Sequence, residues 1–591
     1  MIGLLLSRRR RRAFLYPGAE IRDLPGSGAR RPAHVSMEGQ AKAAVDVGRT
    51  RLAVTAGVFA LAFCVIALRL VDLMALSGGE AVRRAAADRP GAEAVVHRGD
   101  ILDRNGVVLA TNLPTVNLYA DARKVLDPDD TAARLVTVLP DLPFEETRAK
   151  LASGGSFIYL RRSLTPLEQA EVNRLGLPGL EFEAAERRVY PHGRLAAHVL
   201  GATSVDNDGL AGVERAFDSR LGQDNRPLAL SLDIRVQHAV HEVLSEAVAR
   251  FDAKGGVGLV ADAHTGEILA MVSLPDYEPG SFDPKDREAR RNQATLSVFE
   301  MGSTFKLFNT ALGLEVGGYS LSDGFDASRP LRVARFTIND LHGEGRWLTI
   351  PEILIHSSNI GSAKMALSVG GAAQKAFLDR LGLLSPLGVE LPEVGRPQYP
   401  EPWRPINTVT ISYGHGLSVT PLHMVNAVSA LVNGGVLRTP TLLRRAPHVP
   451  VPGRRVLSAQ TSEAMRSLMR QVVTEGTGGK ADVAGYRVGG KTGTAEKAGG
   501  GGYMRKKLRS SFVAAFPMDD PQYVVLALLD EPQGLPETHG YATAGWNAAP
   551  TVGAIIARIA PLLGVRPDTL GPVGPDGVRL AAAGGADRAV Q

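Results

Sequence analysis

Ser303 and Lys306, three residues apart, are the pair in this sequence with the clearest potential for nucleophilic chemistry. Gly302 precedes the serine, and apolar residues recur beyond the lysine at helical spacing, at Leu307, Phe308, Ala311, Leu312 and Leu314. The pattern predicts that Ser303 is the first residue of a helix and that the Lys306 ammonium group can reach its hydroxyl. A lysine kept from water can take the proton of a serine and make it a nucleophile. Such pairs also occur by chance on solvated helices, so other residues must support this interpretation.

A second pair of polar residues, Ser357 and Asn359, begins another helical pattern. The hydroxyl of Ser357 could relay a proton, and the amide of Asn359 could hold a substrate carbonyl. Serine and asparagine are also common helix N-caps, and for this pair alone the N-cap is the simpler interpretation.

A third group is Lys491, Thr492, Gly493 and Thr494, in a predicted strand Tyr486–Thr494 that is unusually rich in glycine. One lysine and two hydroxyls at a strand edge would suit a carboxylate, and a glycine there indicates close approach of a ligand to the backbone. The spacing of a phosphate-binding loop, G-x-x-x-x-G-K-[ST], is also met, ending at Thr492. A strand runs through that spacing and glycines follow it where a helix is required, which argues against nucleotide binding.

The three groups occur in the order Ser-x-x-Lys, Ser-x-Asn, Lys-Thr-Gly, and in this order the chain resembles the penicillin-recognising serine acyltransferases. It is similar throughout to their class B, and especially to the division-specific branch (the FtsI type), from the anchor to about residue 565. The stretches that carry this likeness are Arg98–Gly106, Thr265–Met271, Arg291–Asn292, Ser412–Leu422 and Thr474–Tyr486. Two residues depart from the family pattern: Met301 stands where proline is usual, and His415 where an aromatic residue or glutamine is commoner.

The resemblance implies a D,D-transpeptidase that crosslinks peptidoglycan stem peptides and is inhibited by β-lactams. It implies that Ser303 is the nucleophile and Lys306 its base. Ser357 would relay a proton, and Asn359 would contact the donor peptide. Lys491, Thr492, Gly493 and Thr494 would form the carboxylate site. The backbone N–H groups of Ser303 and Thr494 would form the oxyanion hole. The resemblance implies no cofactor, and the spacing of Cys and His predicts no metal site. The implied partner is a polytopic glycan polymerase (FtsW type) among other division proteins.

Other activities of the same chemistry are less consistent with the sequence. A bifunctional enzyme would need a glycosyltransferase domain, for which residues 74–228 are too short and lack paired acids. A β-lactamase would need a deacylating base, and a D,D-carboxypeptidase would lack the membrane-proximal Arg98–Gly106 pattern. An elongation-type transpeptidase and a catalytically silent division scaffold remain the alternatives.

The N-terminal part of the chain is predicted to be a membrane anchor. Residues 1–51 hold 11 Lys and Arg, including the run Arg8–Arg12, against four acids, and read as a disordered basic tail. An apolar stretch in residues 52–73 follows, short for a membrane helix but extended past Arg69. The charge distribution places the N-terminus in the cytoplasm and the chain from about residue 74 on the other side of the inner membrane. A cleaved signal peptide normally has a much shorter basic region, and Met37 is an alternative start. Cys64 is the only cysteine, so the exported part has no disulfide.

The 591 residues are too many for one hydrophobic core. We predict a mixed α+β pedestal of the dimerisation type in residues 74–228, a transpeptidase domain in 229–567 and a loose tail in 568–591. In the pedestal, a hairpin turns at Asn105-Gly106, and Arg98, Asp100 and Arg104 are expected to form structural ion pairs. The order of strands and helices after residue 229, with a helix capped by Asp233, predicts an α+β domain with an antiparallel sheet flanked by helices.

Overall fold

The computed structural model describes residues 53–67 and 97–581, apart from 224–225, 281–286, 342, 448, 500–501, 569 and 574–578. The chain divides into two units, Met1–Val95 and Val96–Gln591. In the first unit, residues 53–67 form an exposed helix. None of the helices described has the length and apolarity needed to cross a membrane. The whole of the predicted basic tail (including Met37), both ends of the predicted anchor and most of the predicted C-terminal tail lie outside the described residues.

The second unit begins with a sheet in the strand order β3-β2-β1-β7, with β4 also paired to β2. Its strands are β1 (Ile101–Leu102), β2 (Val108–Ala120), β3 (Ile158–Leu164), β4 (Leu180–Val189) and β7 (Leu228–Ala229). Three helices pack on β2–β4 around a separate small core, namely α3 (Pro128–Val138), α4 (Phe144–Ala152) and α5 (Pro166–Leu175). Shorter elements follow: η2 (Gly193–Ala196), α6 (Ala197–Leu200), β5 (Ala202–Thr203), β6 (Gly209–Ala211), α7 (Gly212–Ala216) and α8 (Asp218–Gln223). This part is the mixed α+β pedestal that the sequence predicted.

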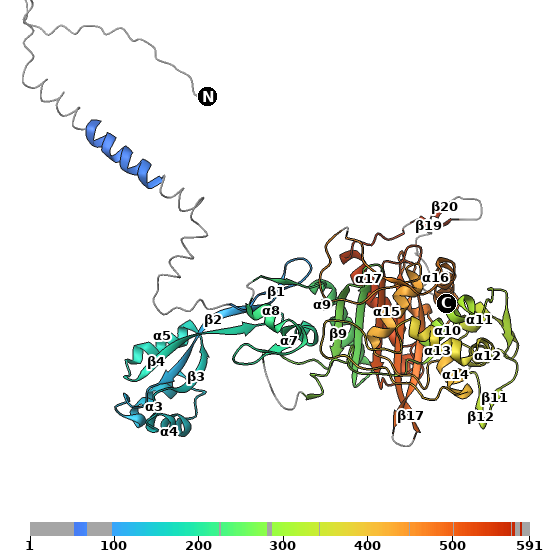
Figure 1. Ribbon diagram of the computed structural model, residues 1–591, viewed down its shortest axis with the longest axis horizontal. Helices are drawn as coiled ribbons and strands as arrows, with labels where there is room; N and C mark the ends of the chain where they lie inside the picture. The colour runs from blue at the N-terminus through green and yellow to red at the C-terminus, as the bar shows by residue number, and fades with distance from the viewer. Residues whose placement is uncertain are drawn as a thin grey trace, which may run out of the picture. The chain divides into compact units, whose positions relative to one another are not determined.

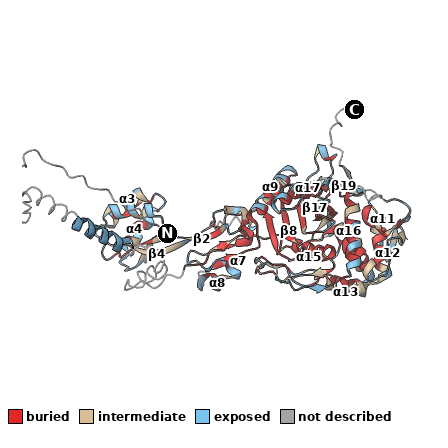
Figure 2. Cartoon of the chain, turned by 90° about the horizontal axis from the view of Figure 1, so that it is seen from above, coloured by how far each residue is buried: buried red, intermediate tan, exposed pale blue. Residues whose placement is uncertain are grey.

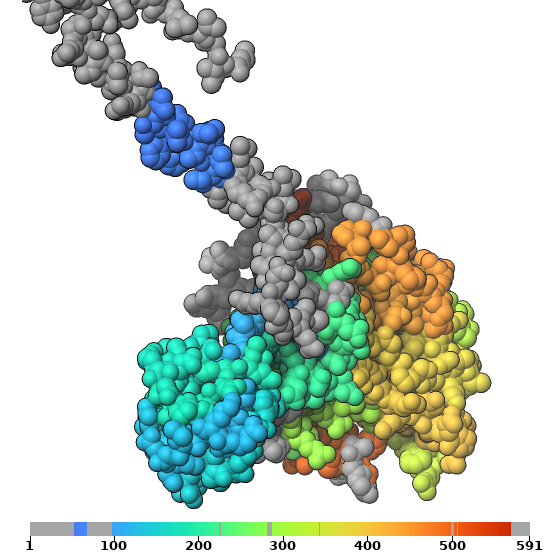
Figure 3. Space-filling model, turned by 60° about the vertical axis from the view of Figure 1, so that its left-hand side comes forward, coloured from blue at the N-terminus to red at the C-terminus, as the bar shows by residue number. Residues whose placement is uncertain are grey.

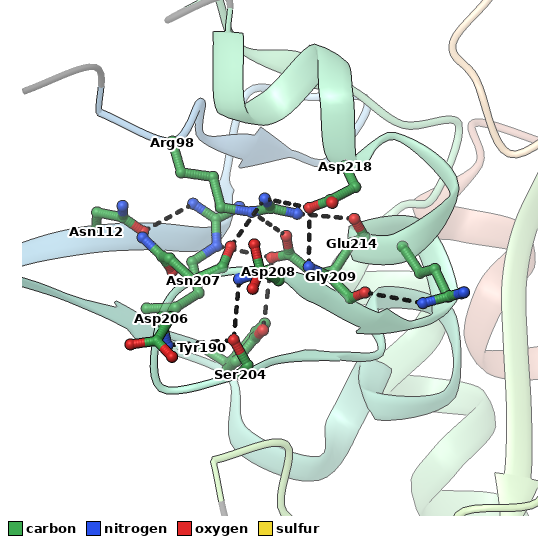
Figure 4. A network of polar contacts seen from close by, with 12 residues as sticks. Arg98, Asn112, Tyr190, Ser204, Asp206, Asn207, Asp208, Gly209, Glu214 and Asp218 are labelled. Atoms are coloured by element: carbon green, nitrogen blue, oxygen red, sulfur yellow. Dashed lines mark hydrogen bonds and ion pairs between the residues drawn. The ribbon is translucent and has the colours of Figure 1, made fainter.

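A buried ion-pair network holds the start of the pedestal together (Figure 4). The Glu214 carboxylate accepts hydrogen bonds of 2.7 Å from both Arg98 and Arg188, and all three side chains are buried. Arg98 also donates to Asp218 at 2.7 Å. Arg98 therefore has the structural role predicted for it, and so does Arg104, which lies 3.8 Å from Glu267. Removing one member of such a buried network leaves an uncompensated charge, which is strongly destabilising.

An antiparallel sheet in the order β16-β17-β18-β8-β9 forms the centre of the rest of the unit (Figure 1). Its strands are β8 (Gly255–Asp262), β9 (Ile268–Leu274), β16 (Gly489–Gly499), β17 (Gly502–Phe516) and β18 (Tyr523–Asp530). Alternate residues of β18 face opposite sides: Val525, Ala527 and Leu529 lie in one core, and the residues between them in another. The sheet is thus buried on both faces, as the red strands in Figure 2 show.

Helices cover both faces of this sheet. The core on one face contains α9 (Ile234–Arg250) and α17 (Ala548–Leu562). The other core contains α10 (Lys306–Glu315), α15 (Pro421–Val432) and α16 (Ala459–Thr474). The remaining elements are β10 (Gly324–Asp326), β11 (Leu331–Val333), β12 (Phe336–Ile338), β13 (Trp347–Thr349), α11 (Ile350–Ile355), α12 (Asn359–Val369), α13 (Gly371–Arg380), α14 (Pro405–Ser412), β14 (Val436–Leu437), β15 (Arg454–Arg455), β19 (Leu570–Val573), β20 (Arg579–Ala581) and the short 3-10 helices η4 (Gly302–Phe305), η5 (Gly479–Ala481) and η6 (Pro536–Thr538).

The predicted sheet flanked by helices is confirmed, with corrections in detail. Helix α9 begins directly after Asp233, whose side chain accepts a hydrogen bond from the Arg235 N–H, as predicted. The strand predicted from Tyr486 begins only at Gly489, because Gly485 and Arg487 have φ values of +84° and +42°, which an extended strand cannot contain.

Candidate active site

The turn that carries Ser303 is fixed by backbone contacts. Gly302 has φ +56°, its N–H donates to the Gly414 carbonyl at 3.2 Å, and a Cβ on it would lie 2.6 Å from the Thr494 carbonyl oxygen. Ser303 therefore lies in the 3-10 helix η4, which begins at Gly302 and runs directly into α10 at Lys306. The predicted helix is present, but it begins one residue earlier and its first turn is a 3-10 turn. Met301 is buried, and its carbonyl accepts a hydrogen bond from the Thr304 hydroxyl at 2.9 Å, which holds the turn without a proline.

Lys306 does reach the hydroxyl of Ser303, at 3.2 Å. Its Nζ is also 2.5 Å from the Ser357 carbonyl, 3.1 Å from the Ser357 hydroxyl and 2.7 Å from Asn359 Oδ1. Burial, together with the positive charge of Lys491, holds the pKa of Lys306 well below its usual range, although Asp340 opposes this effect. A neutral amine at this position can accept the serine proton.

Ser357 lies between the two lysines. Its hydroxyl is 3.1 Å from Lys306 Nζ and 3.1 Å from Lys491 Nζ. The residue joins α11 to α12 with φ +57°, a conformation that costs a non-glycine residue about 1–2 kcal/mol. Since the surrounding contacts must hold that conformation, the hydroxyl is kept at a defined place between the two amines.

The N-cap of α12 is Ser358, the residue between the two that the sequence singled out. Its hydroxyl accepts from the Gly361 N–H at 3.0 Å, so Ser357 and Asn359 are left to face Lys306.

Asp340, which sequence reasoning missed, anchors the same helix start. Its carboxylate accepts hydrogen bonds from the Ser358 hydroxyl at 2.7 Å, the Asn359 N–H at 2.5 Å and the Ile360 N–H at 2.9 Å. A carboxylate at a helix N-terminus is stabilised by the unpaired N–H groups and the helix dipole. A polar loop followed by a helix start was the only available signal, and it does not reveal which acid folds back.

The opposite side of the site is β16, the edge strand of the central sheet. Lys491 is buried, and burial lowers its pKa to about 7. Its Nζ is 3.2 Å from the Thr492 hydroxyl, which in turn is 2.8 Å from the hydroxyl of Thr477. Thr494 Oγ1 accepts a hydrogen bond from the Ala544 N–H at 3.1 Å. Because Gly490, Lys491 and Thr492 belong to an antiparallel strand, the phosphate-loop alternative is excluded.

Gly493 permits a close approach, but of protein backbone. A Cβ there would lie 2.4 Å from the Met301 carbonyl oxygen. The same contacts bring the Gly302–Ser303 turn against the backbone of Thr494, whose N atom would lie 3.2 Å from a Cβ on Gly302. The structure therefore brings together Ser303, Lys306, Ser357, Asn359 and the 491–494 stretch of β16.

Glu300 connects three separate segments at one end of this site, and it too was missed. Its carboxylate accepts from the Gly416 N–H at 2.8 Å and from the Tyr503 hydroxyl at 3.1 Å, and lies 3.1 Å from His415 Nδ1. Burial opposes ionisation of Glu300, but these three contacts prevail and hold its pKa below its usual range. The His415 ring also packs edge-on against Tyr503, with centroids 5.4 Å apart. The unusual His415 thus belongs to the contact between the nucleophile turn and β17.

Two family models match the chain. Residues 256–557 match the penicillin binding protein transpeptidase domain, and residues 93–224 match the penicillin-binding protein dimerisation domain. The first range contains all the site residues described above, and the second contains the buried network around Glu214.

Curated proteins match over most of their length. The chain is 44% identical over 485 residues to the probable peptidoglycan D,D-transpeptidase FtsI of Caulobacter vibrioides, covering 80% of this chain and 82% of that protein. It is 31% identical over 508 residues to the peptidoglycan D,D-transpeptidase FtsI of Escherichia coli K12, covering 80% and 85%. A crystal structure of a peptidoglycan synthetase from Bifidobacterium adolescentis has the same fold, with a TM-score of 0.64 at 23% identity over 82% of this chain and 98% of that one.

Proposed function

Since the chain belongs to the class B penicillin-binding proteins of the FtsI type and is a peptidoglycan D,D-transpeptidase, we propose that it works through an acyl-enzyme on Ser303 and crosslinks the wall of the division septum. The observation that carries the first half of this proposal is the position of Lys306 Nζ, buried and 3.2 Å from Ser303 Oγ.

The acylation step follows from the groups around the serine. Lys306 takes the proton as Ser303 Oγ attacks the carbonyl carbon of the penultimate D-Ala. The oxyanion forms between the N–H groups of Ser303 and Thr494, and loss of one such donor typically costs about 100- to 1,000-fold in rate. The C–N bond to the terminal D-Ala then breaks, and Ser357, which contacts both Lys306 and Lys491, delivers a proton to the departing amine.

Substrate binding uses both sides of the site. The side-chain amide of Asn359 holds the donor peptide, while Lys491, Thr492 and Thr494 bind the terminal carboxylate, with Gly493 between them. The amine of a second stem peptide then attacks the ester carbonyl, which frees Ser303 and completes the crosslink. A β-lactam acylates the same serine and stays bound.

Labelling with a fluorescent penicillin tests the assignment of Ser303. We expect the full-length protein to form a covalent adduct that survives denaturation, and Ser303→Ala to form none. Ser368→Ala is the matched control, because Ser368 lies in the same part of the fold but bonds only to Tyr319 and Met365. An unlabelled wild type would leave the silent scaffold as the better hypothesis, and recovery of free enzyme within minutes would favour a β-lactamase.

The septal role, the location and the partner are proposals that rest on the likeness to relatives. They comprise a single-pass inner-membrane protein with a cytoplasmic N-terminus, a periplasmic catalytic domain and a polytopic glycan polymerase (FtsW type) as partner. The likeness to two FtsI proteins supports them. Depletion in cells should produce filaments with incomplete septa; rounded cells that still divide would instead favour an elongation-type enzyme. Co-purification of the polymerase with the full chain, lost on polar substitution within residues 52–73, would support the partner.

A further inference from the structure

A group of arginines lies together on the transpeptidase part of the chain, away from the residues of the active site. No Asp or Glu occurs between Glu401 and Glu463, while β14, β15 and the loop between them contribute five arginines and the end of α13 a sixth. We call this group the arginine face; its members are Arg380, Arg438, Arg444, Arg445, Arg454 and Arg455. In the space-filling view the orange part of the surface includes this stretch (Figure 3), and Arg444, Arg454 and Arg455 are exposed.

None of these six arginines forms an ion pair with a carboxylate in the part of the chain that the structure describes. Several guanidinium groups are instead held by main-chain carbonyls. Arg454 donates to the carbonyl of Arg380 at 2.8 Å, and Arg455 donates to that of Gly434 at 2.7 Å. A carbonyl fixes the position of a guanidinium group without neutralising it, so the positive charge is ordered and still available.

Some carboxylates lie near the arginine face without forming an ion pair with it; Asp262 and Glu315 interact electrostatically with Arg438 and Arg380, respectively. Glu267 accepts from the Arg445 backbone N–H at 2.8 Å, and Glu390 accepts from the Leu442 N–H at 2.8 Å. In addition, Nε and one terminal nitrogen of Arg438, and Nε of Arg445, are buried without an acceptor. Burial lowers the pKa of Arg438. The negative charge of Asp262 opposes this shift, and the positive charge of Arg445 increases it. Within the described residues, the guanidinium groups of the arginine face thus have no carboxylate paired with them.

The position of the arginine face separates it from the catalytic groove. Thr441, within the same segment, pairs with Glu267 at the start of β9. β9 and β16 are the two opposite edges of the central sheet, and the proposed catalytic lysine and threonines are on β16. A long polyanion held at the β9 edge would therefore leave the groove at the β16 edge open.

We propose that the arginine face binds the carboxylates of assembled peptidoglycan, so that the enzyme holds existing wall while its groove processes a separate stem peptide. The inference rests on the proposed function for the identity of the polymer, because stem peptides make peptidoglycan a carboxylate-rich strand. Guanidinium groups suit carboxylates because they can donate two parallel hydrogen bonds. Several exposed contacts of this kind act together along a polymer and weaken with salt.

The test is co-sedimentation of the detergent-solubilised full chain with insoluble, purified peptidoglycan, after acylation of the protein with a β-lactam so that the groove is blocked. The variant R444Q/R454Q/R455Q removes three exposed charges from the arginine face. The control R134Q/R148Q/R558Q removes the same number of charges, but from arginines that already have a carboxylate within 4 Å. Arg134 lies beside Asp130, Arg148 beside Asp129 and Arg558 beside Glu242. We expect the bound fraction to fall about threefold or more in the first variant only, and to fall for the wild type as salt rises above about 0.15 M.

Two further measurements make the result decisive. Peptidoglycan whose carboxylates have been amidated should lose most of its binding to the wild type. Equal binding of R444Q/R454Q/R455Q and the wild type, or of amidated and native peptidoglycan, overturns the proposal. Flotation with anionic phospholipid vesicles but no sedimentation with peptidoglycan also overturns it, in favour of a lipid surface. Penicillin labelling of the same proteins tests the proposed function separately, because a wild type that is not labelled would refute that function. The binding assay addresses the arginine face alone.

Discussion

Asp340→Ala should separate the folding of the transpeptidase part from the assembly of its active site. Asp340 makes no contact with Ser303, yet its carboxylate holds the Ser358 hydroxyl and the N–H groups of Asn359 and Ile360. Without it, the start of α12 loses its anion and three hydrogen bonds, and Asn359 loses the group that fixes its backbone next to Lys306.

The expected magnitudes differ for stability and activity. Asp340 is partly exposed, so water can replace some of the lost bonds, and the cost should be that of one good helix cap, about 1–2 kcal/mol. A displacement of Ser357 and Asn359 by about 1 Å would lower the acylation rate by about 100-fold. Rates of labelling by a fluorescent penicillin, together with thermal unfolding followed by fluorescence, measure both effects.

Asp323→Ala is the matched control for this experiment. Asp323 accepts two hydrogen bonds from Ser320 in an exposed turn and touches none of the proposed catalytic residues. It should lose stability to a similar or smaller extent and label at the wild-type rate. If Asp340→Ala also labels within about twofold of wild type, then Asp340 does not position Ser357 and Asn359, and the reasoning fails.

Three further predictions concern the other walls of the site. Tyr503→Phe removes only the hydroxyl that donates to Glu300, and should slow penicillin acylation about three- to tenfold without changing the unfolding temperature by more than about 2 °C; an unchanged rate would count against a positioning role. Gly302→Ala should abolish labelling, since its Cβ would lie 2.6 Å from the Thr494 carbonyl oxygen, whereas Gly318→Ala, with a similar φ of +68° but no atom within 4 Å, should cost only about 1–2 kcal/mol of stability; equal effects would show that the contact is unimportant. Because the folded pKa of Lys491 is about 7 and that of an unfolded lysine about 10.4, the unfolded state binds more protons between these values, and the stability of the wild type should rise with pH in that window relative to Lys491→Met. If the unfolding temperatures of the wild type and Lys491→Met differ by the same amount at every pH in this window, the lowered pKa of Lys491 is contradicted.

The parts of the site that could be predicted from the sequence are those whose residue types are themselves the chemistry. A serine and a lysine one turn apart can be recognised in a sequence because their contact depends on local helical geometry, and the structure places Lys306 Nζ 3.2 Å from Ser303 Oγ. Even there, the sequence did not reveal that the first turn is a 3-10 helix, since that depends on Gly302 packing against Thr494.

The parts that could not be predicted depend on contacts between distant segments. Asp340 lies 19 residues before the Asn359 N–H that it binds, and Glu300 lies 115 residues before His415 and 203 before Tyr503. Nothing in the local pattern selects these acids from the others. Similarly, the antiparallel sheet followed from the order of the strands and helices along the chain, whereas the true start of β16 depended on the φ values of Gly485 and Arg487.

The backbone packing around the nucleophile restricts how this enzyme can evolve resistance to inhibitors. Gly302, Gly414 and Gly493 each lie so close to neighbouring backbone that a Cβ would come within 2.6 Å of a carbonyl oxygen. The position of Ser303 is therefore set by main-chain atoms, which substitutions of side chains elsewhere barely move. Variants that discriminate between an inhibitor and a stem peptide should consequently arise in the surrounding side-chain walls, such as those formed by His415 and Tyr503, and rarely in the turn itself.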